Sequence, residues 1–533
     1  MPARRAPAGA PAGHEVELKL DARPADLARL AQHPRLLELA DGRPRRRTLR
    51  SVYFDTADLA LWRGGLVLRV RADGRRRIVG VKTRGVVRGG LVVREEVEAP
   101  LVGGAPDPRR AAPGALLASI SEPRLRRAVE RAAGGARLVP RVETRFRRKE
   151  LHLRLGTAAI ELAVDEGEVR AGRQRLPIHE LELELRSGPT RLLFDLALRL
   201  AADVELRPSA LGKAERGFAR LLGEEARPTR AEAVTLGSDA SVEAMLRTVF
   251  GECVRHLTAN QPAAAHGGDP EGVHQMRVGA RRLRSALRLF HPWLPAHTTQ
   301  ALSDELRWLG SELGAARDLD VFSGDLLGPL ARERPDDKGL AALLEAAEAA
   351  RAEAYAAARA ALASRRYALL VLRLGRFVES PPSRRGARAA LRAPARPAVR
   401  RLLRRRAARM QALGDRLEQL SPRELHRLRI RTKRLRYAIE LVGALFGEKD
   451  GARAARRLAE LQDVLGHLND LAGAESLLTQ LRERLGAHVS PATVRAEGFV
   501  LGYAARSAAG GRAELADAWG RAARIAPLWK GHR

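Results

Sequence analysis

Residues 14–20 read HEVELKL, in which Glu15, Glu17 and Lys19 alternate with aliphatic residues. In a β-strand, residues i, i+2 and i+4 point to the same face. The charged side chains of this stretch therefore share one face and the aliphatic side chains share the other. Taken alone, the pattern is typical of an amphipathic strand with one solvated face.

The alternation recurs in six further stretches before about Gly188, and this repetition changes its interpretation. Acidic residues dominate some stretches and basic residues dominate others, whereas burying charge of one sign alone would be very unfavourable. We therefore expect a closed antiparallel β-barrel tunnel whose lumen carries both signs. The charged residues concerned are Arg69, Arg71, Lys82, Arg84, Arg94, Glu96, Glu98, Glu143, Arg145, Arg147, Glu161, Asp165, Glu180, Glu182 and Glu184.

A lumen of this kind suits a metal–triphosphate complex. Carboxylates are ligands that Mg²⁺ and Mn²⁺ prefer, while Arg and Lys neutralise phosphate oxygens. Hydrolysis then requires a water activated for in-line attack on the terminal phosphorus, either by a second metal or by a tunnel carboxylate.

The overall charge also favours a polyanionic partner. The 533 residues include 96 Lys and Arg against 63 Asp and Glu, a formal net charge of +33. Aromatic residues make up 4% of the chain, which weighs against base stacking on a single strand. Because no groove-reading motif is present either, a polyanion without bases, such as anionic lipid or polyphosphate, fits better than nucleic acid.

The number of cysteines and the length of the apolar stretches indicate the cellular compartment. Cys253 is the only cysteine, which excludes intramolecular disulfides and cysteine-based metal clusters. Residues 1–13 have no apolar core of signal-peptide length, and nowhere do about 18 consecutive apolar residues occur. We expect a cytoplasmic protein without a membrane partner, associated with polyphosphate granules if it binds that polymer.

From Ser241 onward, Ala, Leu, Arg and Glu dominate at helical spacing. The sequence therefore predicts a multidomain α+β protein, in which a β-barrel tunnel precedes an all-α, pseudo-twofold pair of helical bundles. Pro, Gly and Ser mark two breaks, near 224–239 and 380–397. The expected parts are a disordered N-terminus at 1–13, the tunnel domain at 14–222, a linker at 223–237, and the helical domain at 238–530 with repeats at about 240–379 and 398–530.

The helical part contains an internal repeat. HQMRVGARRLRSALRLF begins at His274, and HRLRIRTKRLRYAIELV begins 152 positions later at His426. LGAARD, ending at Asp318, and LGHLND, ending at Asp470, have the same offset. Two motif pairs in one register indicate two copies of one bundle, in which we expect the aspartates to anchor the helices.

The first copy carries a basic stripe. At 100° per residue, His274, Arg277, Arg281, Arg284 and Arg288 fall within an arc of about 80°, away from the apolar face. A single charged face is often only solvated, but residues 400–436 around the second copy contain 14 Arg or Lys and 3 Asp or Glu. Because repulsion among these bases would be costly without an anion, the sequence predicts a polyanion-binding surface.

Motifs of the first half resemble the CYTH, or triphosphate tunnel metalloenzyme, superfamily. They are Glu15-x-Glu17-x-Lys19, YFDT at 53–56, LVLRVR at 66–71, ELELEL at 180–185 and KAERG at 213–217. The resemblance covers residues 14–222 and implies hydrolysis of inorganic triphosphate to diphosphate and phosphate with Mg²⁺ or Mn²⁺. It assigns metal binding to Glu15, Glu17, Asp165, Glu180 and Glu182; substrate binding to Lys19, Arg69, Arg71, Lys82, Arg145, Arg147 and Lys213; and catalysis to Glu15, Glu17, Lys19, Lys82, Arg145 and Glu182.

The paired His-x-x-Arg-x-x-x-basic-Arg-Leu-Arg motifs resemble the CHAD domain. This resemblance covers residues 238–530 and implies helical bundles that bind inorganic polyphosphate. The matching positions are His274, Arg277, Arg281, Arg282, Arg284, His426, Arg429, Lys433, Arg434 and Arg436.

A nucleic-acid-binding protein remains possible because the net charge permits it. Two further functions remain open at this point. One is a polyphosphate scaffold or granule protein whose tunnel binds without turnover. The other is a different activity of the same tunnel, as an organic triphosphatase acting on thiamine triphosphate or nucleotides, or as an adenylate cyclase.

Overall fold

The computed structural model describes residues 14–30, 32–104, 107–209, 211–223 and 225–524. The expected disordered segment 1–13 and the end of the expected helical domain, 525–530, lie outside these ranges. The chain divides into two compact units, Met1–Arg227 with Ser364–Ser380, and Pro228–Ala363 with Pro381–Arg533.

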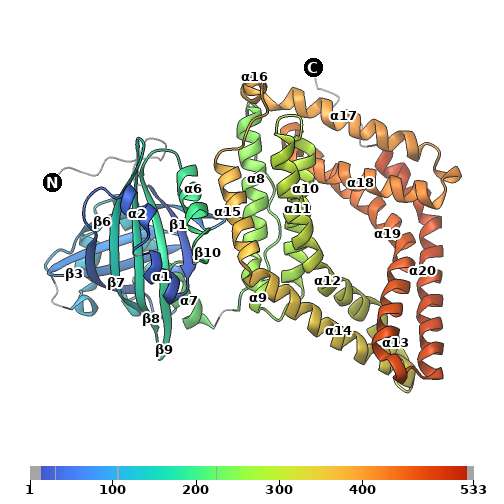
Figure 1. Cartoon of the computed structure of the whole chain (residues 1–533), viewed down its shortest axis with the longest axis horizontal. Coiled ribbons are helices and arrows are strands. Elements are labelled where there is room, and N and C mark those ends of the chain that lie inside the picture. Colours follow the sequence, from blue (N-terminus) through green and yellow to red (C-terminus); the bar gives the residue numbers. More distant parts are fainter. Residues whose placement is uncertain (1–13, 31, 105–106, 210, 224, 525–533) are drawn as a thin grey trace. The chain divides into compact units, whose positions relative to one another are not determined.

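Within the described part of the first unit, eight antiparallel strands close into a barrel, which confirms the expected fold (Figure 1). The order around the barrel is β1, β9, β8, β7, β2, β3, β4 and β6, and the pairing of β6 with β1 completes the circle. These strands are β1 (His14–Ala22), β2 (Arg45–Asp55), β3 (Leu66–Asp73), β4 (Arg76–Thr83), β6 (Leu91–Pro100), β7 (Val139–Leu155), β8 (Ala158–Ala171) and β9 (Gln174–Ser187). Two short strands, β5 (Val86–Arg88) and β10 (Leu206–Pro208), pair with β6 and β1.

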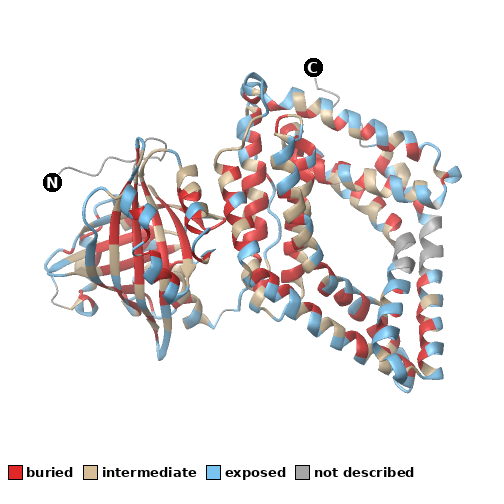
Figure 2. Cartoon of the chain, viewed as in Figure 1, coloured by how far each residue is buried: buried red, intermediate tan, exposed pale blue. Residues whose placement is uncertain are grey.

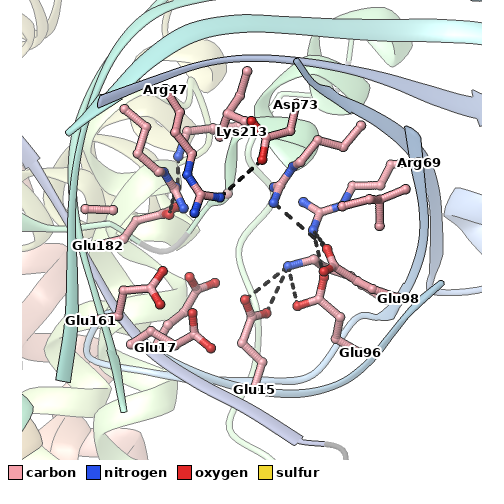
Figure 3. Close-up of a pocket in the computed structure, with 18 of the residues that line it drawn as sticks. Glu15, Glu17, Arg47, Arg69, Asp73, Glu96, Glu98, Glu161, Glu182 and Lys213 are labelled. Carbon is pink, nitrogen blue, oxygen red and sulfur yellow. Dashed lines mark hydrogen bonds and ion pairs between the residues drawn. The ribbon is translucent and has the colours of Figure 1, made fainter. Parts of the chain in front are cut away.

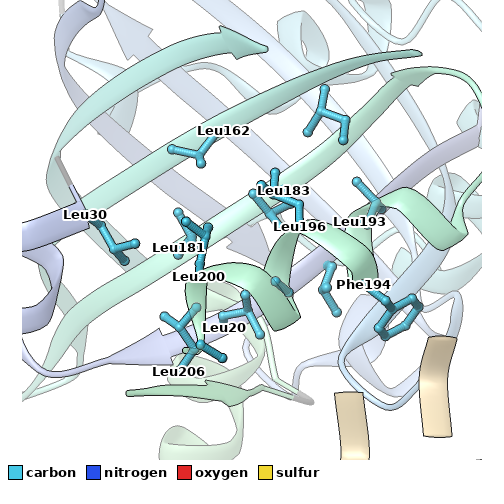
Figure 4. Packing of buried hydrophobic residues seen from close by; sticks show 14 of the residues in the cluster. Leu20, Leu30, Leu162, Leu181, Leu183, Leu193, Phe194, Leu196, Leu200 and Leu206 are labelled. Atoms are coloured by element: carbon cyan, nitrogen blue, oxygen red, sulfur yellow. The ribbon is translucent and has the colours of Figure 1, made fainter. Parts of the chain in front are cut away.

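Helices cover the outer face of the barrel on the β1–β9 side. Leu18 pairs in register with Leu183, so the leucines of both strands point outward. They pack under α1 (Pro24–Leu30), α2 (Pro34–Leu39) and α6 (Arg191–Leu200). Figure 4 shows this core, in which Leu193, Phe194, Leu196 and Leu200 of α6 lie against Leu20, Leu181 and Leu183 of the sheet.

A second outer core lies over β2, β3 and β4. Val52, Leu68 and Val81 of these strands are almost fully buried there. The residues that cover them belong to α3 (Ala60–Arg63), α4 (Pro113–Ala118) and α5 (Pro123–Ala133). Burying aliphatic residues outside leaves the charged residues of the same strands on the inner face.

The inner face becomes apolar near α7 (Lys213–Leu222). Phe218 of α7 packs there with Val142, Phe146 and Val169 of β7 and β8. A Cβ atom at Gly217 would lie 2.5 Å from a methyl group of Val142, so only glycine allows this close approach. The helix thus closes the lumen at this end and places its first residue inside it.

A helix from the middle of the chain completes the first unit. This helix, α15 (Arg365–Glu379), contributes Leu372 to the core beneath α6. Arg376 donates to Asp195 at 2.7 Å, and Arg365 donates to the carbonyl oxygen of Ala201 at 2.6 Å. Residues 364–380 therefore fold with the barrel, although the surrounding sequence is helical and belongs to the second unit.

The second unit is helical throughout its regular structure as described. Its helices are α8 (Val242–Ala259), α9 (Gln261–His266), α10 (Glu271–Phe290), α11 (Ala296–Glu312), α12 (Gly314–Val321), α13 (Gly328–Glu333), α14 (Lys338–Ala363), α16 (Arg388–Arg392), α17 (Ala395–Gly414), α18 (Pro422–Val442), α19 (Glu448–Leu485) and α20 (Pro491–Ala523). Buried residues recur along one side of each long helix, as expected for packed amphipathic helices (Figure 2). Across the described residues, no helix has the length and apolarity that crossing a membrane requires.

The two motif helices, α10 and α18, pack against each other. Each also packs on its own neighbours, α10 on α8 and α11, and α18 on α17 and α19. The sequence repeat thus brings its two basic helices together inside one unit.

Candidate active site and polyanion surface

The barrel encloses a cavity of about 1720 Å³ that is lined by the charged inner faces of its strands (Figure 3). Acidic and basic side chains face one another across it, as the alternation in sequence predicts. The expected site residues found at its surface are Glu15, Glu17, Lys19, Arg69, Arg71, Lys82, Glu182 and Lys213.

Glutamates crowd the wall formed by β1, β9 and β8. Glu17 lies opposite Glu184 in register, and Glu184 lies opposite Glu161. Burial raises the pKa of Glu184 to about 8; Arg186 opposes this rise, and the carboxylates of Glu15, Glu161 and Glu17 add to it. Because a divalent cation would relieve this crowding of hard oxygen donors, the residues present fit Mg²⁺ or Mn²⁺.

Two cations join this acidic wall to the neighbouring strands. Lys82 Nζ lies 3.0 Å from Glu15 and 2.9 Å from Glu96. Arg94 donates to Glu15 and to Glu17, each at 2.7 Å. Burial alone would raise the pKa of Glu15, but Lys82 and Arg94 hold it well below its usual range. Glu15 is therefore ionised and available as a ligand at neutral pH.

The opposite wall carries excess positive charge. Arg69 donates to Glu96 at 2.8 Å and to Glu98 at 2.5 Å. Burial would raise the pKa of Glu98, but Arg69 and Arg71 lower it to about 2. Arg71 is itself 3.9 Å from Glu98, and burial together with repulsion from Arg69 lowers its pKa. An anion between these guanidinium groups would remove that repulsion.

Lys213 holds the closed end of the cavity. Its Nζ lies 2.7 Å from Asp165, 2.8 Å from Glu180 and 2.8 Å from Glu182. Burial would lower the pKa of Lys213, but Asp165 and Glu182 raise it. The ammonium group also lies 5.0 Å from the centre of the Phe146 ring. The ammonium group of Lys213 is therefore charged and held in place by three carboxylates.

In the helical unit, bases crowd the contact between α10 and α18. Arg281 donates to the hydroxyl group of Tyr437 at 3.2 Å. Burial lowers the pKa of Lys433 to about 7, and the charges of Arg281, Arg429 and Arg436 contribute. Arg281, Arg429 and Arg436 thus place three guanidinium charges around Lys433 at this surface.

Comparison with family models identifies both parts. Residues 13–218 match the CYTH domain, and residues 248–479 match the CHAD domain. The chain carries a CYTH domain followed by a CHAD domain.

Similar proteins cover parts of this architecture. An inorganic triphosphatase from Haemophilus influenzae is 30% identical over 211 residues, which are 40% of this chain and 55% of that protein. An uncharacterized protein from Mycobacterium tuberculosis is 28% identical over 312 residues, 56% of each chain. The matched regions thus span about half the length of these relatives. The crystal structure of the CHAD domain from Ricinus communis is 34% identical, covers 56% of this chain and 97% of that one, and has a TM-score of 0.48.

Two expected substrate-binding residues of the CYTH domain do not face the lumen. Arg145 and Arg147 are exposed on the outer face of β7, and their inward placement was wrong. The inner face of β7 instead carries Phe146, Arg148 and Glu150. Charged residues occupy both faces of this strand, so alternation alone does not show which face points inward.

Arg148 takes the inner position instead. It donates to Asp165 at 2.6 Å and to Glu182 at 2.5 Å. Burial would lower the pKa of Arg148, but Asp165 and Glu182 keep it well above its usual range. Arg148 was missed from the sequence because it directly follows Arg147, and the alternation was assigned to Arg147.

Asp165 and Glu180, two of the expected metal ligands, do not line the cavity. Both point inward but are fully buried, and neither reaches the cavity surface. Asp165 accepts from Arg148 and pairs with Lys213, and Glu180 pairs with Lys213 and Arg216. Their carboxylates hold these cations in place, because a buried cation requires such partners.

Several cavity residues were not assigned a role from the sequence. Glu150, His152 and Glu161 form the one set among the described residues whose metal-type donor atoms all lie within 4.8 Å of one another. Glu96, Glu98 and Glu184 belong to strands whose alternation was recognised. Further charged lining residues without a sequence assignment include Arg45, Arg47, Asp73, Arg75, Arg76, Arg77, Arg148 and Arg186.

The CHAD residues divide into a surface group and a buried exception. His274, Arg277, Arg281, Arg284, Arg429, Lys433 and Arg436 are half-buried, and His426 and Arg434 are exposed. Arg282 is instead buried, with 4% of its surface exposed, and its charge acts on Cys253 and His256 of α8. Arg282 thus faces the core, and its assignment to the binding surface was wrong.

One further arginine, Arg406, lies beside the basic residues of α10 and α18. Arg277 pairs with Asp318 at 3.4 Å, while the side chain of Asp470 lies outside the described part of the structure. Arg406 of α17 donates to the carbonyl oxygens of Arg434 and Arg288, each at 3.4 Å. Burial and the charges of those two residues lower the pKa of Arg406 to about 10. Arg406 therefore belongs to the same crowded set of cations.

Proposed function

We propose that the CYTH barrel hydrolyses inorganic triphosphate to diphosphate and phosphate, and that the CHAD domain binds inorganic polyphosphate. One observation supports the first part above all. The glutamates of β1, β8 and β9 face the arginine and lysine side chains of β3 and β4 within one cavity. A metal-bound chain of phosphates is complementary to both walls at once.

The basic residues bind and orient the substrate in this proposal. Arg69, Arg71 and Lys82 bind the phosphate oxygens along the β3–β4 wall, and Lys213 binds at the closed end. Phosphoryl transfer depends mainly on positioning and on stabilising the charge of the transferred group, which these side chains supply. Water attacks the terminal phosphorus, the bridging P–O bond breaks, and diphosphate leaves.

The acidic residues supply the metal site. Glu15, Glu17 and Glu182 would hold Mg²⁺ or Mn²⁺, and the structure adds Glu184 and Glu161 on the same wall. When bound, the metal would neutralise phosphate charge and polarise the bond that breaks. Lys82 and Arg94, which now pair with Glu15, hold its carboxylate in place.

The decisive measurement is phosphate release from tripolyphosphate by the full chain with Mg²⁺ or Mn²⁺. We expect metal-dependent turnover in the wild type and its loss in Glu17→Gln and Glu182→Gln. Glu166→Gln is the matched control, because Glu166 lies on the outer face of β8 beside the inward-facing Asp165. Absence of turnover with any metal, combined with tight polyphosphate binding, would leave the scaffold function in its place.

The same assay separates the alternative activities of the tunnel. Thiamine triphosphate and ATP are offered at equal concentration, with phosphate and cyclic nucleotide as readouts. The described cavity lining contains mainly charged residues, with Tyr53 and Phe146 as its aromatic side chains, so we expect the inorganic substrate to be preferred. A higher kcat/KM for an organic triphosphate would reassign the substrate.

Polyphosphate binding by the CHAD domain rests on the crowded bases of α10 and α18. We expect the double variant Arg281→Ala, Lys433→Ala to bind polyphosphate more weakly, while Arg453→Ala on an exposed part of α19 does not. Competition between polyphosphate and duplex DNA at matched salt decides the class of anion. Equal competition by DNA would contradict a preference for polyphosphate.

A further inference from the structure

The open mouth of the barrel carries bases beyond those that a triphosphate needs. We call Arg45, Arg47, Arg75 and Arg76 the basic rim. Arg45 and Arg47 stand at the start of β2, and Arg76 starts β4 just after Arg75 in the β3–β4 turn. All four line the same cavity as the catalytic glutamates.

Arg45 of the basic rim lies far from Arg69 along the barrel wall. Tyr53 pairs in register with Arg69, and Arg45 lies eight residues back along β2 from Tyr53. At about 3.4 Å per residue and a strand tilt of about 40°, that separation is roughly 20 Å along the barrel axis. Phosphates bound between Arg69 and Lys82 therefore do not reach Arg45.

Most arginines of the basic rim form no ion pair with the described residues. Arg47 pairs with Asp73 at 3.2 Å and lies 3.8 Å from Glu150. Within the described chain, Arg45, Arg75 and Arg76 have no ion-pair partner, and all three are exposed. Neighbouring like charges on a hairpin are unfavourable unless an anion binds them.

We propose that the basic rim binds the fourth and later phosphates of a linear polyphosphate chain that enters the barrel end-first. This inference rests on the proposed function and extends its substrate from triphosphate to longer chains. The chemistry is the same: water attacks the terminal phosphorus, the bridging P–O bond breaks, and phosphate leaves a chain shorter by one unit.

The test compares two substrates in two matched triple variants of the full chain. One removes three exposed rim residues (Arg45→Ala, Arg75→Ala, Arg76→Ala). The other removes three exposed arginines outside the cavity (Arg127→Ala, Arg131→Ala, Arg137→Ala). The quantity measured is kcat/KM for a chain several times longer than tripolyphosphate, divided by kcat/KM for tripolyphosphate.

We expect this ratio to fall about tenfold in the rim variant and to stay at the wild-type value in the control. The fall should persist when Arg281→Ala and Lys433→Ala are added to both proteins, because it then cannot arise from the CHAD domain. A ratio that is unchanged, or an equal loss on both substrates, would overturn the proposal.

A binding measurement separates this proposal from the proposed function. Long-chain polyphosphate is titrated without divalent cations into the proteins that carry Arg281→Ala and Lys433→Ala. Weaker binding by the rim variant would support the proposed role of the basic rim. It would do so even if the wild type fails to hydrolyse tripolyphosphate, because that failure contradicts only the proposed function. Equal binding of long-chain polyphosphate by the rim variant and the control would contradict the proposed role of the basic rim.

Discussion

Arg147 and Arg148 are consecutive in β7 and lie on opposite faces of the barrel wall. Arg147 has 81% of its side chain exposed outside, whereas Arg148 has 12% exposed and contacts Asp165 and Glu182 inside. The two residues have the same chemistry and nearly the same place in the chain. They therefore form a matched pair for testing which face of the strand acts.

Arg148→Ala should lower kcat/KM for tripolyphosphate at least tenfold, while Arg147→Ala should change it less than about twofold. The reason is that Arg148 orients the carboxylate of Glu182 at 2.5 Å, and Arg147 is outside the lumen. Phosphate release is measured for both, with circular dichroism to show that each variant is folded. A larger loss in Arg147→Ala would show that the outer face of β7 acts in the reaction.

Divalent metal should stabilise the barrel by relieving the crowding of Glu15, Glu17 and Glu184. At a concentration near 100 times Kd, Mn²⁺ or Mg²⁺ should raise the Tm of the barrel transition by about 5 °C. Glu15→Gln should reduce this rise, and the outer-face variant Glu166→Gln should keep it. Thermal unfolding with EDTA and with metal measures the difference. An equal rise in all three proteins would place the metal elsewhere.

Polyphosphate binding by the CHAD domain should weaken as pH rises from about 6 to 8. The pKa of Lys433 is about 7 in the free protein, lowered by burial and then by Arg281, Arg429 and Arg436. A polyanion favours the charged ammonium and raises this pKa, so binding above pH 7 takes up a proton and loses up to about tenfold in affinity per pH unit.

The control for this pH effect is Lys433→Arg, which remains charged throughout the range. Its affinity should be nearly flat with pH. Calorimetry in buffers of different ionisation enthalpy counts the protons taken up by each protein. A wild-type affinity that does not change between pH 6 and 8 would contradict the assignment.

Helix α15 should contribute directly to the stability of the barrel unit. Leu372 is fully buried in the core that also holds Leu193 and Phe194 of α6. Leu372→Ala should therefore cost about 2–5 kcal/mol in the free energy of unfolding. Arg373→Ala, at the adjacent exposed position, should cost little. Denaturant unfolding measures both, and an equal effect of the two substitutions would show that the α15 contact does not stabilise the unit.

Sequence patterns predicted the main parts of the fold because the patterns are local. Alternation in HEVELKL and ELELEL requires strands with a charged and an apolar face, and the 152-residue repeat requires two related helical segments. Most of the expected tunnel residues lie at the cavity surface for the same reason. Spacing within one strand or one helix was enough to group them.

The sequence by itself thus determined the two-part architecture, the mixed charge of the lumen and the paired basic helices. Only the tertiary structure decided that Arg148 replaces Arg145 and Arg147, that Arg282 is buried, and that α15 packs on the barrel. The physical reason is that, in a strand with charged residues on both faces, the neighbouring strands of the closed barrel decide which face points into the lumen. Likewise, a helix with several apolar positions has no partner until the rest of the chain buries one of its sides.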